Sequence, residues 1–236
     1  GKGWIEKNVE GDGLVYPSWH ISGAETGRMS CSNPNMQNIP HKKMPIFRTL
    51  FLSVHKGGRL LIADVSQQET ALLAQYSQDE ELTRLIRDGK DTHLETARTA
   101  LSLPGLKKTD SRRDTIGKTI NLGTPYGLSK WGVARKAQIT EKEAAIFLER
   151  YFRRFNGVRA WMFQMQNQVL KTGFIRTRYG RKVWVNTYAK RWENNAINSP
   201  IQGSAAEMTK MAAGYYEKNA RDPFICLIVH DEMALD

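Results

Sequence analysis

Two aspartates stand where buried strands are expected to end, and this placement could serve chemistry. Asp64 closes the apolar run 59–65, and Asp231 lies between the apolar segments 224–230 and 233–236. Hard divalent cations bind through one or two carboxylates together with substrate phosphates. A pair of such ions can activate an attacking oxygen and stabilise a leaving one. On spacing alone, however, the simpler interpretation is favoured, in which each aspartate merely caps a strand or a turn.

A basic segment, residues 112–126, offers a second arrangement. Lys118, Leu122 and Tyr126 recur at i, i+4 and i+8, so they share one helix face. A lysine, an apolar side chain and an aromatic ring on one face could hold a triphosphate, a base and a sugar. An ordinary amphipathic helix is nevertheless the favoured interpretation of this stretch by itself. The Gly-Lys-Thr run at 117–119 is not a phosphate-binding P-loop, because arginine occupies the position where that motif requires its first glycine.

The elements that must position these residues are mixed in type. Ser66 with Glu69 has the spacing of a capping box at a helix start, and so does Thr140 with Glu143. After short strands and loops in the first fifty residues, we expect a strand at 59–65, a helix at 66–76, a largely helical stretch at 79–167 that includes a helix at 141–155, a hairpin at 174–185, a helix at 202–218, and two strands at 224–230 and 233–236 around an acidic turn. This order predicts an α+β fold rather than a regular βαβ alternation.

The composition indicates a polyanionic partner. The 236 residues include 35 Lys and Arg against 24 Asp and Glu, which gives a formal charge of +11 and a pI near 9.7. Nucleic acid is the commonest partner of so basic a chain, and an anionic membrane surface is the alternative. Cys31 and Cys226 are far apart, in no metal-like spacing, and fit a reducing compartment. The longest apolar run, 224–229, is far shorter than the roughly 18 residues of a membrane span.

Several ordered motifs resemble one known family, the family A (Pol I-like) DNA polymerases. Residues 64–69 (DVSQQE) are similar to its first acidic motif, residues 118–127 (KTINLGTPYG) to its nucleotide-binding fingers helix, and residues 229–232 (VHDE) to its second acidic motif. Further similar blocks are TGRMS at 26–30, NPNMQNIP at 33–40, DTH at 91–93 and NSPIQG at 198–203. Because these motifs occur together and in the family's order, functional roles become the favoured interpretation of Asp64, Asp231 and the segment 112–126.

The resemblance implies a right-hand polymerase fold. Its palm, an antiparallel sheet with helices, would comprise residues 1–74 and 191–236 and present Asp64 and Asp231 side by side. The helical fingers, residues 75–190, would be inserted between the two parts of the palm. Most of the thumb would precede residue 1, and the last palm strands would follow Asp236. Without a thumb this piece is expected to grip DNA poorly and to polymerise inefficiently alone.

The resemblance also implies roles for particular residues. Asp64, Asp231 and the backbone carbonyl of Val65 would hold two Mg²⁺ ions, for which Mn²⁺ can substitute, and Glu232 would support this site. Lys118 would neutralise the triphosphate and protonate the departing pyrophosphate. Glu69 would be a steric gate against the 2′-hydroxyl of ribonucleotides, hydrogen-bonded to Tyr126. The remaining implied dNTP contacts are Gln67, His93, Arg48, Arg113 and Leu122; the implied DNA contacts are Arg28, Asn35, Gln37, Asn38, Asn198, Gln202 and His230.

Five positions depart from the family pattern. Leu122 stands where the family has Phe or Tyr, which affects how dideoxynucleotides are treated. The family arginine four residues before Lys118 is Asp114 here, and Arg113 lies one step earlier, about 100° around the helix. Val65 replaces Tyr, and Asn194 replaces an Arg on the primer–template side. Pro125 lacks the N–H of a regular helix and should kink or end the helix just before Tyr126.

The function implied by the resemblance is template-directed DNA synthesis. The chain would add dNMP from dNTP to a primer 3′-hydroxyl, with primer–template DNA and dNTP as partners, as a monomer and without a membrane. Its location would be the cytoplasm of a bacterium or of a phage-infected host cell. Two alternatives remain open: a reverse transcriptase or single-subunit RNA polymerase relative, and a non-catalytic DNA-binding module that keeps the fold.

Overall fold

A computed structural model describes residues 3–39, 45–220 and 223–236 of the chain. By its internal contacts the chain divides into two compact units. Unit 1 comprises Gly1–Ser66 and Ala205–Asp236, and unit 2 comprises Gln67–Ser204. The palm and fingers boundaries predicted at 74 and 190 fall inside unit 2, and the assignment of palm and fingers stays a prediction.

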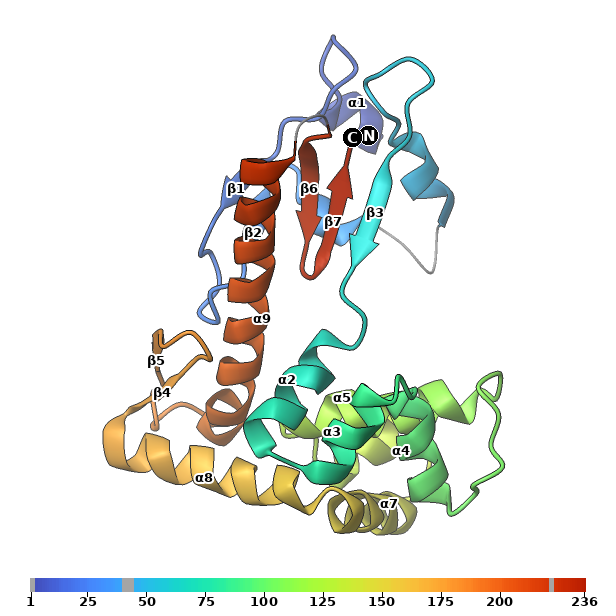
Figure 1. Cartoon of the computed structure of the whole chain (residues 1–236), viewed down its shortest axis with the longest axis vertical. Coiled ribbons are helices and arrows are strands. Elements are labelled where there is room, and N and C mark those ends of the chain that lie inside the picture. The colour runs from blue at the N-terminus through green and yellow to red at the C-terminus, as the bar shows by residue number, and fades with distance from the viewer. Residues whose placement is uncertain (1–2, 40–44, 221–222) are drawn as a thin grey trace. The chain divides into compact units, whose positions relative to one another are not determined.

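Unit 1 is built around a three-stranded antiparallel sheet with the strand order β3-β7-β6 (Figure 1). Its strands are β3 (Leu61–Asp64), β6 (Ile225–Val229) and β7 (Glu232–Leu235). The other elements are α1 (Trp4–Asn8), β1 (Ser18–His20) paired with β2 (Ser30–Ser32), the 3₁₀ turns η1 (Met36–Asn38) and η2 (Pro45–Leu50), and the part of α9 (Trp192–Asn219) that begins at Ala205. The strand predicted at 59–65 forms as β3 and the hairpin predicted at 224–236 forms as β6 and β7. The burial expected of the first strand is wrong, because β3 is an edge strand and its four residues are exposed. The acidic turn expected at 231–232 is also shifted, because Glu232 pairs with Val229 and begins β7.

Unit 2 is mainly helical. In chain order it contains α2 (Gln68–Ser77), α3 (Glu80–Arg87), α4 (Thr92–Leu101), the π-helix η3 (Arg113–Lys118), α5 (Thr119–Gly123), the 3₁₀ turn η4 (Thr124–Tyr126), α6 (Lys130–Ala137), α7 (Glu141–Arg154), α8 (Asn156–Thr172), the hairpin β4 (Phe174–Arg176) and β5 (Lys182–Trp184), and the start of α9 (Figure 1). Its core includes the fully buried side chains of Leu73, Leu82, Ile120, Tyr151, Phe155 and Val158. Helices, a hairpin and an antiparallel sheet together confirm the α+β class.

Two of the predicted helix starts are wrong, and a tertiary contact explains the first. Helix α2 begins at Gln68 without a side-chain cap, so Ser66 forms no capping box. Gln67 takes the N-cap position at φ 55° because its side chain bonds to residues at the start of α4, beginning with Thr92. Helix α9 begins at Trp192 rather than at 202, with Pro200 inside it. Proline normally interrupts a helix pattern, and here it lies buried within the helix.

Three other expectations are confirmed. Thr140 caps α7 in a reciprocal box: its hydroxyl accepts from the Glu143 N–H at 3.2 Å, and its own N–H donates to the Glu143 carboxylate at 2.9 Å. The hairpin at 174–185 forms as β4 and β5. The effect expected of Pro125 also appears, because α5 ends at Gly123 and the chain continues as the tighter turn η4 to Tyr126.

Gly117, in the π-helix, allows α4 and η3 to approach each other closely. A Cβ atom built at Gly117 would lie 2.0 Å from the carbonyl oxygen of His93 and 2.9 Å from the Ala97 Cβ. Backbone at that distance cannot yield as a flexible side chain would. The residue at position 117 therefore sets how closely the phosphate-binding candidates on these two helices can lie.

We expect Gly117→Ala to destabilise the protein by about 1–3 kcal/mol, the usual cost of overpacking a buried site. Equilibrium urea unfolding measures this difference. Gly214→Ala makes the same chemical change inside α9, where no atom of the described residues lies within 4 Å of the added Cβ. It is expected to stabilise the protein by about 1 kcal/mol through helix propensity. Equal stability of Gly117→Ala and the unmodified protein would contradict the close-approach argument.

Candidate active site

The acidic edge of unit 1, defined as Asp64, Asp231 and Glu232, lies at one end of the three-stranded sheet. Asp64 is the last residue of β3 and pairs directly with Glu232, the first residue of β7. Side chains so paired have Cβ atoms about 5 Å apart. Asp231 is fixed beside them because its carbonyl oxygen accepts the Val65 N–H at 3.4 Å. Strand pairing thus brings together acids that are far apart in the sequence.

His230 and Asp231 form the two-residue connection between β6 and β7. Val229 pairs with Glu232, so only these two residues make the turn. His230 adopts the left-handed conformation, φ 59°, which hairpin turns of this length commonly require. His230 is exposed at the tip of the hairpin.

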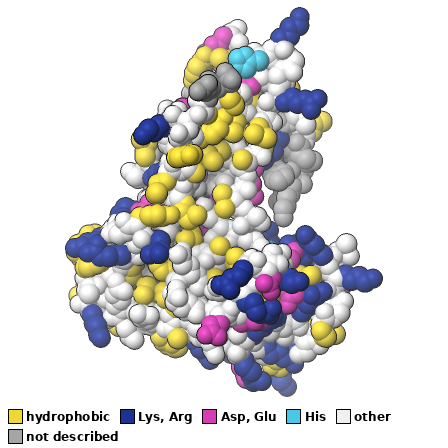
Figure 2. All heavy atoms as spheres, viewed as in Figure 1, with side chains coloured by type: hydrophobic (Ala, Val, Ile, Leu, Met, Phe, Trp, Pro, Cys, Tyr) yellow, Lys and Arg dark blue, Asp and Glu magenta, His cyan; other side chains and the backbone are white. Residues whose placement is uncertain are grey.

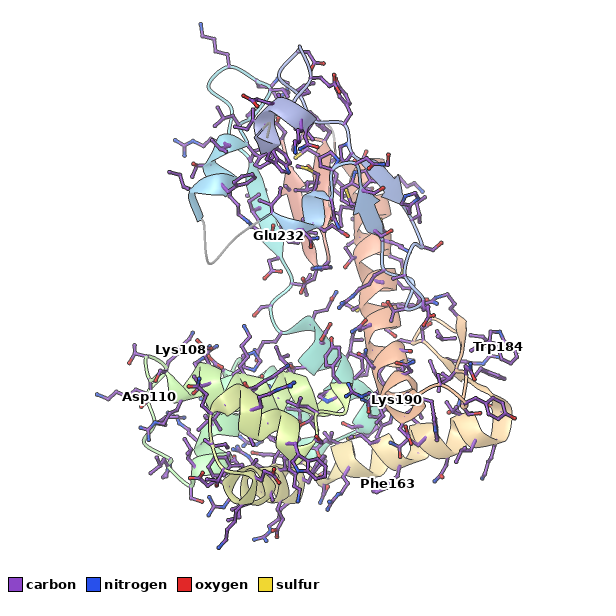
Figure 3. All side chains as sticks on the ribbon, turned by 180° about the vertical axis from the view of Figure 1, so that it is seen from behind. Lys108, Asp110, Phe163, Trp184, Lys190 and Glu232 are labelled. Carbon is purple, nitrogen blue, oxygen red and sulfur yellow. The ribbon has the colours of Figure 1, made fainter. Side chains whose placement is uncertain are left out.

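Arg48 lies against the acidic edge rather than apart from it. Its Nη1 donates to both carboxylate oxygens of Glu232, at 3.1 and 3.2 Å. Both side chains are partly buried, with 33% and 20% of their surfaces exposed. The ion pair holds η2 to β7 and fixes Glu232 (labelled in Figure 3) beside Asp64. This contact agrees with a supporting position for Glu232, and a phosphate contact by Arg48 stays a prediction.

The donor set of the acidic edge fits a hard divalent cation. Carboxylate and backbone carbonyl oxygens are the ligands that Mg²⁺ prefers, and Mg²⁺ usually takes only one or two protein carboxylates together with substrate phosphates. The Asp64 side chain is exposed, and no ion pair engages it within the described parts of the chain. Over the same residues no group of three or more His, Cys, Asp or Glu converges to form a ready-made metal cage. The acidic edge therefore suits an ion that arrives with a phosphate ligand.

Unit 2 carries a cluster of basic side chains at the start of α4. Asp91 caps this helix by accepting the Leu94 N–H at 3.0 Å, and its other oxygen accepts from Arg113 Nε at 2.7 Å. Burial favours the neutral carboxyl, but the Arg113 guanidinium and the Leu94 N–H together hold the Asp91 pKa below its usual value. Arg113 is thereby held in place near His93, although it stands one position before the family arginine.

A chain of hydrogen bonds orients the imidazole of His93. The Asn121 amide nitrogen lies 3.0 Å from His93 Nδ1 and also donates to the Thr92 hydroxyl at 3.0 Å. The Thr92 hydroxyl donates in turn to Gln67 Oε1 at 2.5 Å. Because an amide nitrogen can only donate, Nδ1 accepts and Nε2 carries the proton. The network leaves His93 Nε2–H as the donor available to an anion.

His93 is kept neutral by its surroundings. Burial is the largest cause that lowers its pKa, and the positive charges of Arg113 and Lys118 lower it further. The negative charge of Asp91 raises the pKa and offsets these causes only in part. A neutral imidazole donor beside two cations provides hydrogen bonding to phosphate with the charge supplied by its neighbours. Because the pKa of His93 is lowered in the folded protein, the stability of the fold should depend on pH.

We expect His93→Gln to remove part of the acid sensitivity of folding. A histidine whose folded-state pKa is lowered binds fewer protons than in the unfolded chain, so stability falls as the pH decreases from about 6.5 through the folded-state pKa. In the variant this contribution is absent. Urea unfolding between pH 8 and pH 5 measures it, with His55→Gln as the same change at an exposed position. An unaltered pH slope in His93→Gln would refute the assignment.

Glu69 and Tyr126 meet within unit 2. The Tyr126 hydroxyl donates to the Glu69 carboxylate at 2.5 Å, across 57 residues of sequence. Both side chains are partly buried. Glu69 lies in the first turn of α2 and Tyr126 in η4, so the turn caused by Pro125 places the ring against α2. The hydrogen bond expected between these residues is present.

The remaining predicted dNTP contacts lie on the same helical segment. Lys118 ends the π-helix, Leu122 lies in α5, and Tyr126 follows in η4. All three are partly buried. Because the segment changes from π to α to 3₁₀ geometry, its residues do not keep the uniform spacing of a single α-helix face. Their roles at the nucleotide stay predictions.

The predicted DNA contacts fall in both units. In unit 1, Asn35 caps η1 by accepting the Gln37 N–H at 3.0 Å, Gln37 Nε2 donates to the Met29 carbonyl at 3.3 Å, and Asn38 is exposed. Arg28 is partly buried in the same unit. In unit 2, Gln202 and Asn198 lie on α9, and Asn198 Oδ1 is buried with no hydrogen-bond partner among the residues that the structure describes. Asn35 and Gln37 thus stabilise the local backbone, and the contacts of all these residues to DNA stay predictions.

Two residues of the network, Thr92 and Asn121, were missing from the predicted site. Both are buried polar side chains in helices, and Asn121 is flanked by the apolar residues Ile120 and Leu122. Buried polar groups are normally hydrogen-bonded, so an uncharged polar residue on a helix face otherwise expected to be apolar is the signal that could have identified them. Their partners could not be named from the sequence, because they lie on other helices.

Comparison with known proteins identifies the family. The family described as "DNA polymerase family A" matches residues 4–236. DNA polymerase I of Pseudomonas aeruginosa is 34% identical over 95% of this chain and 26% of its own length. The thermostable DNA polymerase I of Thermus filiformis is 37% identical over 95% of this chain and 28% of its own length. The chain therefore spans between a quarter and a third of these relatives.

A solved structure has the same fold. The POL domain of Pol1 from M. smegmatis, in complex with DNA primer-template and dNTP, matches 98% of this chain and 43% of its own chain, with a TM-score of 0.90 and 33% identity. The match confirms the predicted polymerase fold class. Separately, none of the helices in the described residues is both long and apolar enough to cross a membrane.

Proposed function

Because this chain belongs to DNA polymerase family A, we propose that it forms part of a DNA-directed DNA polymerase that extends a primer with dNTPs. One observation carries the proposal: antiparallel pairing of β3 with β7 joins the two acidic motifs into a single acidic edge. The nucleotide side of the reaction is supported by the ordered donors of unit 2. The whole polymerase, rather than this portion alone, is the proposed catalyst.

Asp64 and Asp231, with the Val65 carbonyl, would hold the divalent ions, Mg²⁺ or in its place Mn²⁺. When bound, such ions neutralise phosphate charge and make the attacking hydroxyl more acidic. The chain's own contribution at this edge is to hold the two carboxylates side by side through strand pairing. The Arg48–Glu232 ion pair holds the neighbouring carboxylate so that β7 and β3 stay in register.

The residues of unit 2 would bind and orient the nucleotide. Lys118 would neutralise the triphosphate and give a proton to the departing pyrophosphate, while His93 Nε2–H and Arg113 would donate to phosphate oxygens. Positioning and charge neutralisation supply most of the rate in phosphoryl transfer. Glu69, held by Tyr126, would occupy the space beside the sugar where a ribonucleotide carries its 2′-hydroxyl. Leu122 would line the same pocket with Gln67 below it.

Primer–template DNA would be the second substrate. Arg28 and Gln202 would read acceptor atoms of the minor groove that every correct base pair presents, which checks shape without reading sequence. Asn35, Gln37, Asn38, Asn198 and His230 would contact the primer and template strands. The protein would act as a monomer, and the bacterial cytoplasm or that of a phage-infected cell, where DNA and dNTPs are present, is the predicted location.

Primer extension tests the proposal. The polymerase that contains this chain is supplied with a labelled primer on a DNA or an RNA template, with Mg²⁺, and with dNTPs or NTPs. Extension with dNTPs on DNA supports the proposal. Preferential use of NTPs would replace it with an RNA polymerase function, and preference for the RNA template would replace it with reverse transcription. Tight binding of the primer–template without any extension would leave a DNA-binding module instead.

A further inference from the structure

The charge of this chain is concentrated in one segment of unit 2. From 150 to 192 the sequence contains eleven Lys and Arg residues and no Asp or Glu. The remaining 24 Lys and Arg residues equal the 24 Asp and Glu residues, so this segment accounts for the whole net charge of +11. It covers the end of α7, all of α8, and the hairpin β4–β5.

The α7 cations of this segment are already engaged. Arg154 pairs with Glu81 at 2.7 Å and with Glu95 at 3.2 Å, and Arg153 pairs with Glu149 at 2.7 Å. Arg150 donates to the Ala100 carbonyl at 2.6 Å. The other eight cations lie farther along the segment: two on α8, two after β5, and four on the hairpin, at 176, 178, 181 and 182.

The hairpin β4–β5, which we name the basic ribbon, has two unlike faces. Ile175 and Val183 are directly paired and buried, so they form its inner face. On the outer face Phe174 pairs with Trp184, and Arg176 pairs with Lys182. The side chain period of a strand is two, so these four residues lie together on the outer face.

The outer face combines exposed rings with cations. Trp184 is 70% exposed, and its ring lies 5.2 Å from that of Phe174. Lys182 Nζ lies 4.6 Å from the Phe174 ring and 5.8 Å from the Trp184 ring, and the Arg176 guanidinium lies 5.5 Å from Phe174. Figure 3 shows Trp184 at the outer side of the ribbon, and Figure 2 shows dark blue and yellow spheres side by side where α8 passes into β4.

The pairing of Arg176 with Lys182 works against folding. Like charges directly opposite each other destabilise an antiparallel pair, and within the described residues no acidic side chain forms an ion pair with either of them. Local conflicts of this kind are expected where a protein binds a ligand. An anion placed between the two cations would relieve the repulsion.

We propose that the outer face of the basic ribbon binds single-stranded nucleic acid, which in the proposed polymerase is the unpaired template strand. A base can stack on the exposed ring of Trp184 while its phosphates contact Arg176 and Lys182, the combination that binds single strands without sequence preference. Duplex DNA offers phosphates but no free base face. An anionic membrane offers charge, but the ribbon presents two cations beside its rings rather than a broad apolar surface to insert.

The inference goes beyond the proposed function, and it rests on that function only for the identity of the strand. The test compares two primer–templates that share one duplex and differ in the 5′ template overhang, 2 or 12 thymidines long. Fluorescence anisotropy gives Kd for the polymerase containing this chain, without nucleotide. The ratio of the two Kd values isolates the contribution of the unpaired strand. Because no synthesis is needed, a catalytically inactive protein still gives a result.

Trp184→Ala is expected to reduce the advantage of the long overhang by about tenfold, within the range for loss of one base–aromatic stack. Arg176→Gln/Lys182→Gln is expected to reduce the slope of log K against log salt for the long overhang by about 1.4, because two single-strand phosphate contacts contribute about 0.7 each. Neither change should alter Kd for the short overhang. The thermal midpoint of the double variant reports separately on folding, because the change removes a repulsion but also the Arg176–Gly180 hydrogen bond and the contacts of both cations with the Phe174 ring.

Lys136→Gln/Lys142→Gln is the matched control, because it removes two exposed cations from α6 and α7 of the same unit. It should leave the ratio of the two Kd values unchanged. Equal weakening of both primer–templates by Trp184→Ala overturns the proposal. A second result also overturns it: the ribbon variants keep the ratio of the two Kd values but lose binding to phosphatidylserine vesicles. That result would assign the ribbon to an anionic membrane surface. A protein that keeps the ribbon-dependent ratio but never extends a primer contradicts only the proposed function.

Discussion

Asp231→Asn is expected to lower the rate of primer extension by about 10³-fold or more at saturating dNTP. The substitution keeps the size of the side chain and removes one of the two carboxylates of the acidic edge that would bind divalent ions. Metal ions contribute several kcal/mol of transition-state stabilisation in reactions of this kind, and about 4 kcal/mol corresponds to a factor of 10³. Single-turnover extension of a labelled primer measures the loss.

The structure makes this variant interpretable. Asp231 contributes its backbone carbonyl to the Val65 N–H, and that bond survives the substitution, so the turn between β6 and β7 should keep its shape. Asp12→Asn makes the same change on an exposed loop of the same unit and should leave extension unchanged. Primer–template affinity should change little in Asp231→Asn. A rate within tenfold of the unmodified protein would remove the acidic edge from the mechanism.

Glu69→Ala is expected to reduce the preference for dNTP over NTP by about 100-fold, measured as the ratio of kcat/KM values for each. Pockets that only reject an added hydroxyl discriminate by about that factor, and removing the carboxylate opens the space in which a 2′-hydroxyl would lie. The gain should come from better use of NTP, with a smaller decrease for dNTP. Extension of one primer by a single matched nucleotide of each kind gives both values.

Two further variants separate the size of the Glu69 side chain from its hydrogen bond. Glu69→Gln keeps the volume and should keep most of the discrimination if the gate is steric. Tyr126→Phe removes the donor that holds the carboxylate at 2.5 Å, and a hydrogen bond to a charged group contributes about 1.5–3 kcal/mol, so partial relaxation of the gate is expected. Full discrimination in Glu69→Ala would show that another residue excludes ribonucleotides.

Local sequence patterns predicted much of the secondary structure. The apolar runs around Asp64 and Asp231 form strands β3, β6 and β7, and the Thr140–Glu143 capping box begins α7. These features depend on neighbours within a few residues, as in the kink after Gly123 caused by Pro125. The family was also readable from the sequence, since ordered motifs need no knowledge of contacts.

The tertiary structure decided which distant residues meet wherever the resemblance to the family did not already imply the contact, as it did for Glu69 with Tyr126. Ser66 has the pattern of a helix cap, yet Gln67 takes the N-cap position because its side chain bonds to Thr92 on another helix. Asn121 has an ordinary place in a helical segment, yet its side chain contacts and orients His93, which lies on α4. The basic ribbon likewise needs strand pairing to place Arg176 opposite Lys182. The periodicity of apolar residues within one segment predicts which of its faces is buried. The partner that covers this face depends on how several segments pack together, and the sequence of one segment does not specify it.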